Sequence, residues 1–256
     1  MIDASPAGMN PPETATPNDA LKSEPGGRRK ILVVLHQENS SPGRIGRLLR
    51  DAGMELDIRL PRYGDPLPAE LADHAGAIIF GGPMSANDED DYLRREIDWI
   101  GVPLRERKPF MGICLGAQML ARHLGHRVYR HPRGKVEIGY HPIVPTEAGH
   151  SCCDEQFPEQ VYQWHREGFD LPRGATLLAE GQEFEAQAFG YEQAFGFQFH
   201  PEVTYAMICC WTVRHADRLS EDGAQPPHLH QQGWFRHDAA VAGWLAAFLR
   251  RWLGQA

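Results

Sequence analysis

The junction between an apolar run and a helical pattern, at residues 108–125, constrains the fold of this chain most. The apolar residues from Pro109 to Ile113 predict a buried strand. A helical pattern begins directly after Cys114 and continues to Leu124, and Gly125 predicts its end. The sequence therefore predicts a strand, a sharp turn at one cysteine, and a helix.

Cys114 stands where such a turn would carry a nucleophile. The positive end of the helix dipole favours the thiolate form, and Gly112 and Gly116 leave room for the tight backbone path. The alternative is a small buried hydrophobic residue, the usual state of a free cysteine. The position at the junction favours the nucleophile. The adjacent pairs Cys152–Cys153 and Cys209–Cys210 lack this context and are interpreted as structural.

A partner for the thiol stands far downstream, where an alternating strand ends at His200 and Glu202 follows. In an extended chain, residues two apart share one face, so Glu202 can reach the His200 imidazole and fix its tautomer. The alternative for Glu202 is a carboxylate stabilised at a helix N-terminus. Cys114, His200 and Glu202 are thus the candidate nucleophile, base and orienting carboxylate.

Strands and helices alternate in the first half of the chain. We expect strands at 30–36, 55–60, 77–80 and 109–113, and helices at 42–52, 93–104 and 115–124. Later strands are expected at 135–144, 161–164, 176–179, 186–191 and 195–199, the last two as a hairpin, with helices after Glu202 and at 238–253. This order predicts an α/β fold: a flavodoxin-like, open, mostly parallel sheet with helices on both faces, plus a smaller antiparallel β portion.

Composition limits the partners and the compartment. The 256 residues carry a formal net charge of −8, which provides no basic field for nucleic acid. No apolar stretch is long enough to span a membrane, and the N-terminus lacks the regions of a signal peptide. Five cysteines, four of them in adjacent pairs, do not resemble a disulfide framework. We therefore expect a cytoplasmic protein with a free thiol, binding neither nucleic acid nor membrane.

The domain organisation is simple. Residues 1–29 are rich in Pro, Ala, Thr, Glu and Gly without apolar periodicity, which predicts a disordered leader. Residues 30–256 are expected to form one domain. Within it, residues 216–236 have no clear period, and their role cannot be assigned.

Three motifs carry a resemblance to a known family: Phe-Gly-Gly-Pro at 80–83, Gly-Ile-Cys-Leu-Gly-Ala-Gln at 112–118, and Phe-His-Pro-Glu at 199–202. Together they resemble the class I, or triad, glutamine amidotransferases, in particular the glutaminase of GMP synthetase type and its free-standing relatives. The resemblance implies that the backbone amides of Gly82 and Leu115 hold the oxyanion formed during acyl transfer. An ordinary tight turn is the alternative for Gly82. The resemblance also implies that Gln118 contacts the amino-acid moiety of the substrate.

Residues 162–167 match the segment that closes over the glutamine backbone in this family, where relatives often carry His-Gly-Asp. The triplet here is His165-Arg166-Glu167, so an arginine replaces the glycine. Because glycine lets backbone approach a ligand closely, this departure leaves the shape of the pocket open. Arg166 could meet the substrate carboxylate and Glu167 the substrate ammonium, or the two could form a solvated ion pair. All three are candidate substrate-binding residues.

No metal or other cofactor is expected. Histidines cluster at 123–131 and at 228–230, but neither cluster has cysteine or carboxylate at a recognised ligand spacing. No glycine-rich phosphate loop of nucleotide-binding type is present.

The leading hypothesis is cysteine-dependent hydrolysis of a γ-glutamyl amide through a thioester. The expected substrate is glutamine, and the products are glutamate and ammonia. Family members usually pass ammonia to a synthetase, so a separate synthetase subunit is an expected partner. Two alternatives remain: a γ-glutamyl peptidase or hydrolase acting on γ-glutamyl amines or glutathione-like substrates, and a non-catalytic regulatory module that kept the fold.

Overall fold

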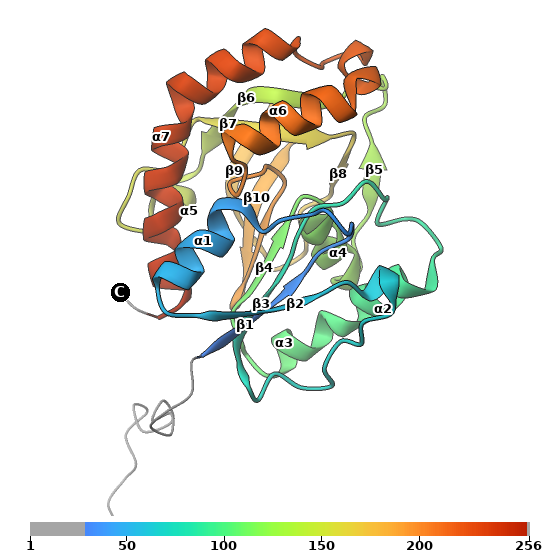
Figure 1. Cartoon of the computed structure of the whole chain (residues 1–256), viewed down its shortest axis with the longest axis vertical. Coiled ribbons are helices and arrows are strands. Elements are labelled where there is room, and N and C mark those ends of the chain that lie inside the picture. Colours follow the sequence, from blue (N-terminus) through green and yellow to red (C-terminus); the bar gives the residue numbers. More distant parts are fainter. Residues whose placement is uncertain (1–28, 255–256) are drawn as a thin grey trace, which may run out of the picture.

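The computed structural model describes residues 29–254 of the chain (Figure 1). The predicted disordered leader at residues 1–29 lies outside these residues, apart from its last position. The strands in the described part are β1 (Lys30–Val34), β2 (Glu55–Arg59), β3 (His74–Ile79), β4 (Phe110–Ile113), β5 (Val128–Arg130), β6 (Glu137–Pro145), β7 (Gln160–His165), β8 (Glu167–Phe169), β9 (Thr176–Gly181), β10 (Ala186–Tyr191) and β11 (Ala194–Phe197). The helices are α1 (Gly43–Asp51), η2 (Pro61–Tyr63), α2 (Asp91–Trp99), α3 (Gly101–Arg105), α4 (Leu115–His123), α5 (Glu147–His150), α6 (Tyr205–Arg214), η3 (Ala216–Ser220) and α7 (Pro227–Trp252).

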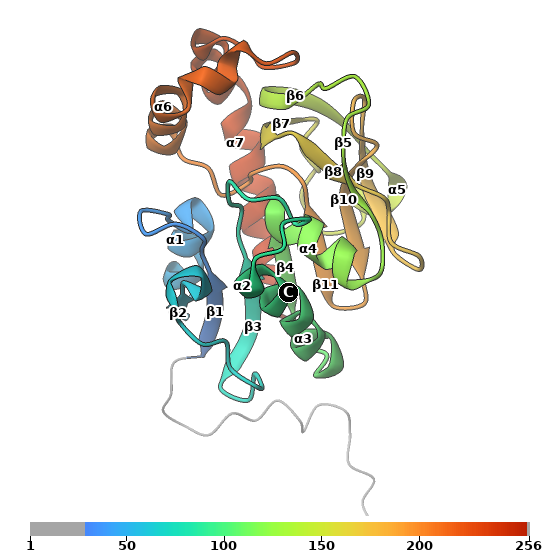
Figure 2. The ribbon, with the colours of Figure 1, turned by 90° about the vertical axis from the view of Figure 1, so that its right-hand side faces the viewer.

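A nine-stranded sheet organises the molecule, in the order β2-β1-β3-β4-β11-β10-β9-β6-β7. The first five strands are parallel, and the last four add on in antiparallel pairs. Strands β5 and β8 form a separate two-stranded sheet. Figure 2 shows the parallel strands on one side of the molecule and the antiparallel strands on the other. The predicted fold class is confirmed, including the hairpin that joins β10 to β11.

Alternate residues of the parallel strands face two separate cores. In β1, Ile31 and Val33 belong to one buried cluster, whereas Leu32 and Val34 belong to the other. Helices α1 and α7 cover the first face, and α2, α3 and α4 cover the second (Figure 1). Strands buried on both faces read as continuous apolar runs, which is why the sequence predicted them well. The sheet is therefore the middle of three layers.

The single helix predicted at 93–104 is wrong, because the structure has two helices there. Helix α2 ends at Trp99, and α3 starts at Gly101. Pro103 explains the break, since a proline has no N–H to donate to the carbonyl four residues earlier, and its ring clashes with that carbonyl.

The start predicted for the last helix, Asp238, is also wrong. Helix α7 begins at Pro227, so the second half of the segment at 216–236 is helical. The additional turns are held by polar and small residues: the His230 ring contacts the Tyr162 hydroxyl and the Gln225 carbonyl, and Gly233 packs against Tyr140. His230 and Gly233 continue the helical spacing of the apolar residues, but a search for apolar periodicity does not detect them because neither has an apolar side chain.

Several short elements carry no expectation from the sequence, namely β5, β8, α5, η2 and η3. Each spans five residues or fewer, which is too few for periodicity to register. Within residues 29–254, none of the helices combines the length and the apolar character needed to cross a bilayer.

Candidate active site

Cys114 occupies a strained turn between β4 and α4. Its backbone lies at φ 50° and ψ −104°, a region that non-glycine residues rarely adopt. The backbone N–H of Cys114 donates to the Phe197 carbonyl at 2.7 Å, and its carbonyl accepts from the Gln118 N–H at 3.0 Å. The neighbouring strand and the new helix therefore hold the strained residue on both sides.

Gly112 and Gly116 make this turn possible by close backbone approach. A Cβ at Gly112 would lie 2.4 Å from the Gly116 carbonyl oxygen, and one at Gly116 would lie 2.1 Å from the Ile79 carbonyl oxygen. Both distances are far inside contact range, so neither position can carry a side chain without displacing the backbone. The glycines flanking Cys114 thus let α4 start directly against β3.

His200 and Glu202 meet Cys114 at the carboxyl edge of the sheet. The Nδ1 atom of His200 lies 2.8 Å from Glu202 Oε1, and both side chains are buried. Cys114 lies near this ring, close enough for its sulfur to raise the pKa of His200. Gly81 lies against both residues: a Cβ there would be 2.9 Å from His200 Cε1 and 3.4 Å from Cys114 Cβ.

The electrostatics favour a protonated His200. Burial alone would lower the pKa of His200, but the Glu202 carboxylate and the Cys114 sulfur outweigh it and raise the pKa to about 10. An imidazolium that faces a sulfur on one side and a carboxylate on the other can hold a thiolate and can donate a proton.

The first helix anchors the carboxylate segment. The Arg44 N–H at the start of α1 donates to the Glu202 carbonyl at 2.8 Å. The backbone turns sharply at Gly43, where φ is 52° and a Cβ would lie 2.2 Å from the same carbonyl oxygen. One buried carboxylate oxygen, Glu202 Oε2, has no hydrogen-bond partner among the described residues.

A cleft of about 590 Å³ opens above these side chains. It is bounded by the loop after β1, the turn after β3, the end of β7, and α6. Among its lining residues are Cys114, His200, Glu202, Gly81, Gly82, Gln118, Trp164, His165, Arg166, Glu167, Cys210 and Trp211. A cleft of this size is in the range that holds small-molecule ligands.

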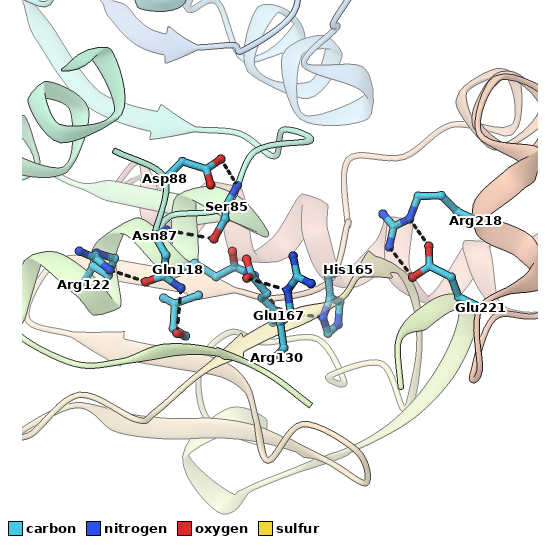
Figure 3. Close-up of polar contacts among 11 residues, drawn as sticks. Ser85, Asn87, Asp88, Gln118, Arg122, Arg130, His165, Glu167, Arg218 and Glu221 are labelled. Atoms are coloured by element: carbon cyan, nitrogen blue, oxygen red, sulfur yellow. Dashed lines mark hydrogen bonds and ion pairs between the residues drawn. The ribbon is translucent and has the colours of Figure 1, made fainter. Parts of the chain in front are cut away.

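Gln118 lies on the cleft wall, but its amide is already engaged. The side-chain Nε2 donates to the carbonyl of Glu167, which lies beside Gln118 in Figure 3, at 2.8 Å. It also donates to Gln198 Oε1 at 3.2 Å. Gln118 thereby braces the 165–167 turn while it lines the cleft, and its contact with the substrate stays a prediction.

The ring of His165 is turned inward, although the residue lines the cleft, and its role in substrate binding stays a prediction. Its Nδ1 lies 3.0 Å from the Glu167 carbonyl, and its Nε2 lies 3.0 Å from Glu137 Oε2. The register pairs His165 with Glu137 across β7 and β6. Burial raises the pKa of Glu137, but contacts with His165, His141 and Gln187 outweigh this and leave the pKa below its ordinary value.

Arg166 and Glu167 differ in exposure. Arg166 is exposed at the cleft, whereas Glu167 is buried, with its Oε1 atom 3.6 Å from Arg130 Nε (Figure 3). An ion pair between Arg166 and Glu167, one of the two alternatives, is not among the ion pairs of the described residues; Glu167 pairs with Arg130 instead.

The two backbone amides considered for an oxyanion come from the turn after β3 and from the start of α4. Gly82 follows β3 and lines the cleft, and Leu115 is the first residue of α4. The N–H groups of a first helical turn have no acceptor within the helix, so they are free for a ligand. The Leu115 side chain itself is buried in the core beneath α4.

Comparison with sequence profiles of protein families matches residues 38–207 to the glutamine amidotransferase class-I family. The chain belongs to this family. Cys114, His200 and Glu202 all lie within the matched residues. Within residues 29–254, no group of three or more His, Cys, Asp or Glu side chains is gathered as a metal site requires.

Named relatives of this amidotransferase differ in how much of their own length the chain covers. The chain is 32% identical over 188 residues to the putative glutamine amidotransferase-like protein YfeJ of Salmonella typhimurium, covering 70% of this chain and 78% of that protein. It is 31% identical to the GMP synthase of Caldicellulosiruptor saccharolyticus over 70% of its own length, but spans only 34% of that protein. The chain thus corresponds to about a third of that GMP synthase.

Solved structures of glutamine amidotransferases share the fold across nearly the whole chain. One from Thermotoga maritima is 30% identical, with a TM-score of 0.78 over 89% of this chain and 99% of that one. Another, from Methylobacillus flagellatus, is 26% identical, with a TM-score of 0.81 over 90% of this chain and 96% of that one.

Two buried histidine–carboxylate pairs near this amidotransferase site were not predicted, His36–Glu96 and His165–Glu137. A signal for one was present. Glu96 lies on the helix face formed by Leu93 and Ile100, where an unpaired carboxylate would be costly. A charged residue inside an apolar stripe indicates a buried partner.

Proposed function

We propose that this amidotransferase hydrolyses a γ-glutamyl amide, with glutamine as the substrate, through a thioester on Cys114. The observation that carries the proposal is the placement of Cys114 and His200 together in the cleft, both against Gly81, with His200 Nδ1 2.8 Å from Glu202 Oε1. A nucleophile, a proton carrier and an orienting carboxylate are the parts that thiol-dependent acyl transfer requires.

In the acylation step, the Cys114 thiolate attacks the γ-carbonyl carbon, a C–S bond forms, and the carbonyl electrons move to oxygen. The Gly82 and Leu115 amides donate hydrogen bonds to that oxyanion. Protonated His200 gives its proton to the amide nitrogen, the C–N bond breaks, and ammonia leaves.

In the hydrolysis step, neutral His200 takes a proton from water, and the resulting hydroxide adds to the thioester carbon. The same two amides stabilise the second oxyanion. The C–S bond then breaks, Cys114 returns as thiolate beside protonated His200, and glutamate is released. Glu202 keeps the His200 ring in position throughout.

The test measures glutamate release from glutamine and labelling by a diazo-ketone analogue of glutamine. Cys114→Ser and His200→Ala are each expected to lower kcat by about 10³-fold or more, as loss of a nucleophile or its base does in comparable triads, and to abolish labelling. Cys210→Ser is the matched control, because Cys210 also lines the cleft, and it should keep both activity and labelling. Labelling at Cys210 alone, or none with folded protein, would contradict the proposal and favour a non-catalytic module.

A second candidate keeps this chemistry and changes the leaving group. The cleft of about 590 Å³ extends past His200 to Trp164 and Trp211, which offers more room than ammonia requires. A γ-glutamyl peptide or γ-glutamyl amine would use that space. Comparing kcat/KM for glutamine with that for γ-glutamyl dipeptides separates the two: a preference for the dipeptides would favour the second candidate.

The ammonia formed from glutamine needs an acceptor if the protein is biosynthetic. We propose a separate synthetase subunit, because the matched part of the chain spans only 34% of the GMP synthase of Caldicellulosiruptor saccharolyticus. We also propose a cytoplasmic location, since all five cysteines carry free thiols and a reducing compartment keeps Cys114 reactive. Co-purification of a synthetase with the tagged protein tests the first proposal, and fractionation of cells tests the second.

A further inference from the structure

A buried histidine–carboxylate pair lies behind the turn that carries Gly82. His36 follows β1, and its Nε2 lies 2.8 Å from Oε2 of Glu96 on α2. Neither side chain has any exposed area. The other ring nitrogen of His36, Nδ1, lies 3.1 Å from the carbonyl oxygen of Gly81. The proposed reaction uses none of these groups directly.

The hydrogen-bonding capacity of the partners fixes where the protons are. A carbonyl oxygen only accepts, so His36 Nδ1 carries a hydrogen and donates it to Gly81. The second proton lies between His36 Nε2 and Glu96 Oε2, on one atom or the other. In both arrangements the Glu96 contact occupies Nε2 and aims the Nδ1–H at Gly81.

The contact between His36 and the Gly81 carbonyl also sets the direction of the Gly82 N–H, because both groups belong to one planar peptide. The peptide between Gly81 and Gly82 is trans, so the carbonyl of Gly81 and the N–H of Gly82 point in opposite directions. With the Gly81 carbonyl directed at buried His36, the Gly82 N–H points away from His36. The cleft lies on that side, because Gly81 and Gly82 line it together with Cys114.

The Gly81–Gly82 peptide can rotate more easily than most, so a hydrogen bond from outside is needed to fix its orientation. It is flanked by two glycines, which lack the Cβ atoms that restrict backbone rotation elsewhere. Rotation of this peptide would replace the N–H in the cleft with a carbonyl oxygen, which repels an oxyanion. The hydrogen bond from His36 opposes that rotation.

We propose that His36, held by Glu96, is a positioning residue that fixes the Gly81–Gly82 peptide with its N–H directed at the reacting carbonyl. The inference rests on the proposed function, since it concerns the oxyanion of the same reaction. Its loss should affect kcat and leave substrate binding largely unchanged, because the Gly82 N–H is needed most when charge develops on oxygen.

Two variants separate the two contacts of His36. In His36→Asn, the amide nitrogen is as many bonds from Cα as Nδ1 is, so the donor to Gly81 is kept. In His36→Gln, the amide corresponds to Nε2, so contact with Glu96 is kept and the donor to Gly81 is lost. For glutamine hydrolysis we expect kcat about 10²-fold lower in His36→Gln, the usual effect of losing one oxyanion donor. The asparagine variant should stay within about tenfold of wild type, and KM should change little in either.

Two further measurements distinguish positioning from general damage. A γ-aldehyde analogue of glutamate adds to the Cys114 thiol and forms a tetrahedral oxyanion adduct, so its affinity should fall about 10²-fold in His36→Gln. Alkylation of Cys114 by iodoacetamide forms no oxyanion and should keep its wild-type rate. If His36→Gln does not fold, Glu96→Leu compared with Glu96→Gln takes its place, with only the leucine variant losing analogue affinity.

The possible outcomes separate the inference from the proposed function. If wild-type protein hydrolyses glutamine and His36→Gln keeps its kcat and its analogue affinity, the positioning role is overturned while the proposed function stands. A parallel loss of iodoacetamide reactivity would also overturn it, as structural damage. If the wild type hydrolyses no γ-glutamyl amide, crystal structures of the two His36 variants still test the inference: a Gly81 carbonyl unmoved in His36→Gln contradicts it.

Discussion

At the scale of single residues, the raised pKa of His200 has a testable consequence for activity. A raised pKa keeps the imidazole protonated to higher pH, and protonated His200 is the form proposed to donate to the leaving amine. Glu202→Gln removes the negative charge that raises this pKa, while its amide oxygen can still accept from Nδ1. The pKa of His200 should therefore fall, and the alkaline limb of kcat/KM for glutamine hydrolysis should move to lower pH by about one unit or more.

The control for this prediction is Glu38→Gln. Glu38 is a carboxylate that lines the same cleft without contacting His200 in the described structure. Its pH profile should match that of the wild type. An unmoved alkaline limb in Glu202→Gln would mean that His200 is not the group whose deprotonation limits the reaction.

Sequence could place a residue where its role depends on neighbours in the same segment, and could not where it depends on residues far along the chain. Cys114 and Glu202 were assigned from their own segments, a strand–helix junction and a two-residue spacing. The inward turn of His165 was not predictable in this way, because it depends on the register that sets Glu137 beside it across β6 and β7. Register is fixed by residues far apart in the chain.

At the scale of elements, one ion pair joins α1 to α7 next to the site. Arg44 Nη2 lies 2.6 Å from Oδ2 of Asp238, and the Arg44 side chain is only 5% exposed. The backbone N–H of the same Arg44 holds Glu202. Burial raises the pKa of Asp238 in spite of its contact with Arg44, which indicates that desolvation of this carboxylate is costly.

Asp238→Asn should destabilise the protein because it leaves the Arg44 charge buried without its partner. We expect the free energy of unfolding to fall by on the order of 3 kcal/mol, measured by urea denaturation. The double variant Arg44→Met, Asp238→Leu should recover most of this loss, since no buried charge remains. Asp91→Asn, in the exposed pair with Arg94, is the control and should change stability by less than about 0.5 kcal/mol. A stability of Asp238→Asn equal to that of the control would contradict the prediction.

The elements themselves were predictable where hydrophobic periodicity is complete. The parallel strands and helices α1 and α4 follow it closely. It failed at α7, where His230 and Gly233 take the inward positions that an apolar pattern would need, and at α2, where Pro103 interrupts a pattern that periodicity alone treats as continuous. The first miss reflects inward side chains that are not hydrophobic, and the second reflects the backbone restriction that a proline imposes.

At the scale of the whole molecule, α7 covers the sheet face beneath the strands that lead to Cys114 and His200. Phe248 on α7 packs its ring 5.0 Å from Phe195 and 5.1 Å from Phe197, edge to face, and is 1% exposed. These contacts bring the last helix of the chain against β11. The core on this face of the sheet therefore joins residues from the first and second halves of the chain, and loss of this contact should weaken both together.

Phe248→Ala should lower the stability of the whole domain in a single cooperative transition. Removing a fully buried phenylalanine costs about 4 kcal/mol through lost burial and the cavity that remains, which corresponds to a fall in Tm of about 10 °C for a domain of this size. Phe235→Ala on the same helix is the matched control, because Phe235 is 78% exposed and should shift Tm by only a degree or two. Thermal unfolding followed by circular dichroism measures both. If Phe248→Ala instead produced two separate transitions, α7 would be an appendage that unfolds independently, and the shared core on this face of the sheet inferred from these contacts would be wrong.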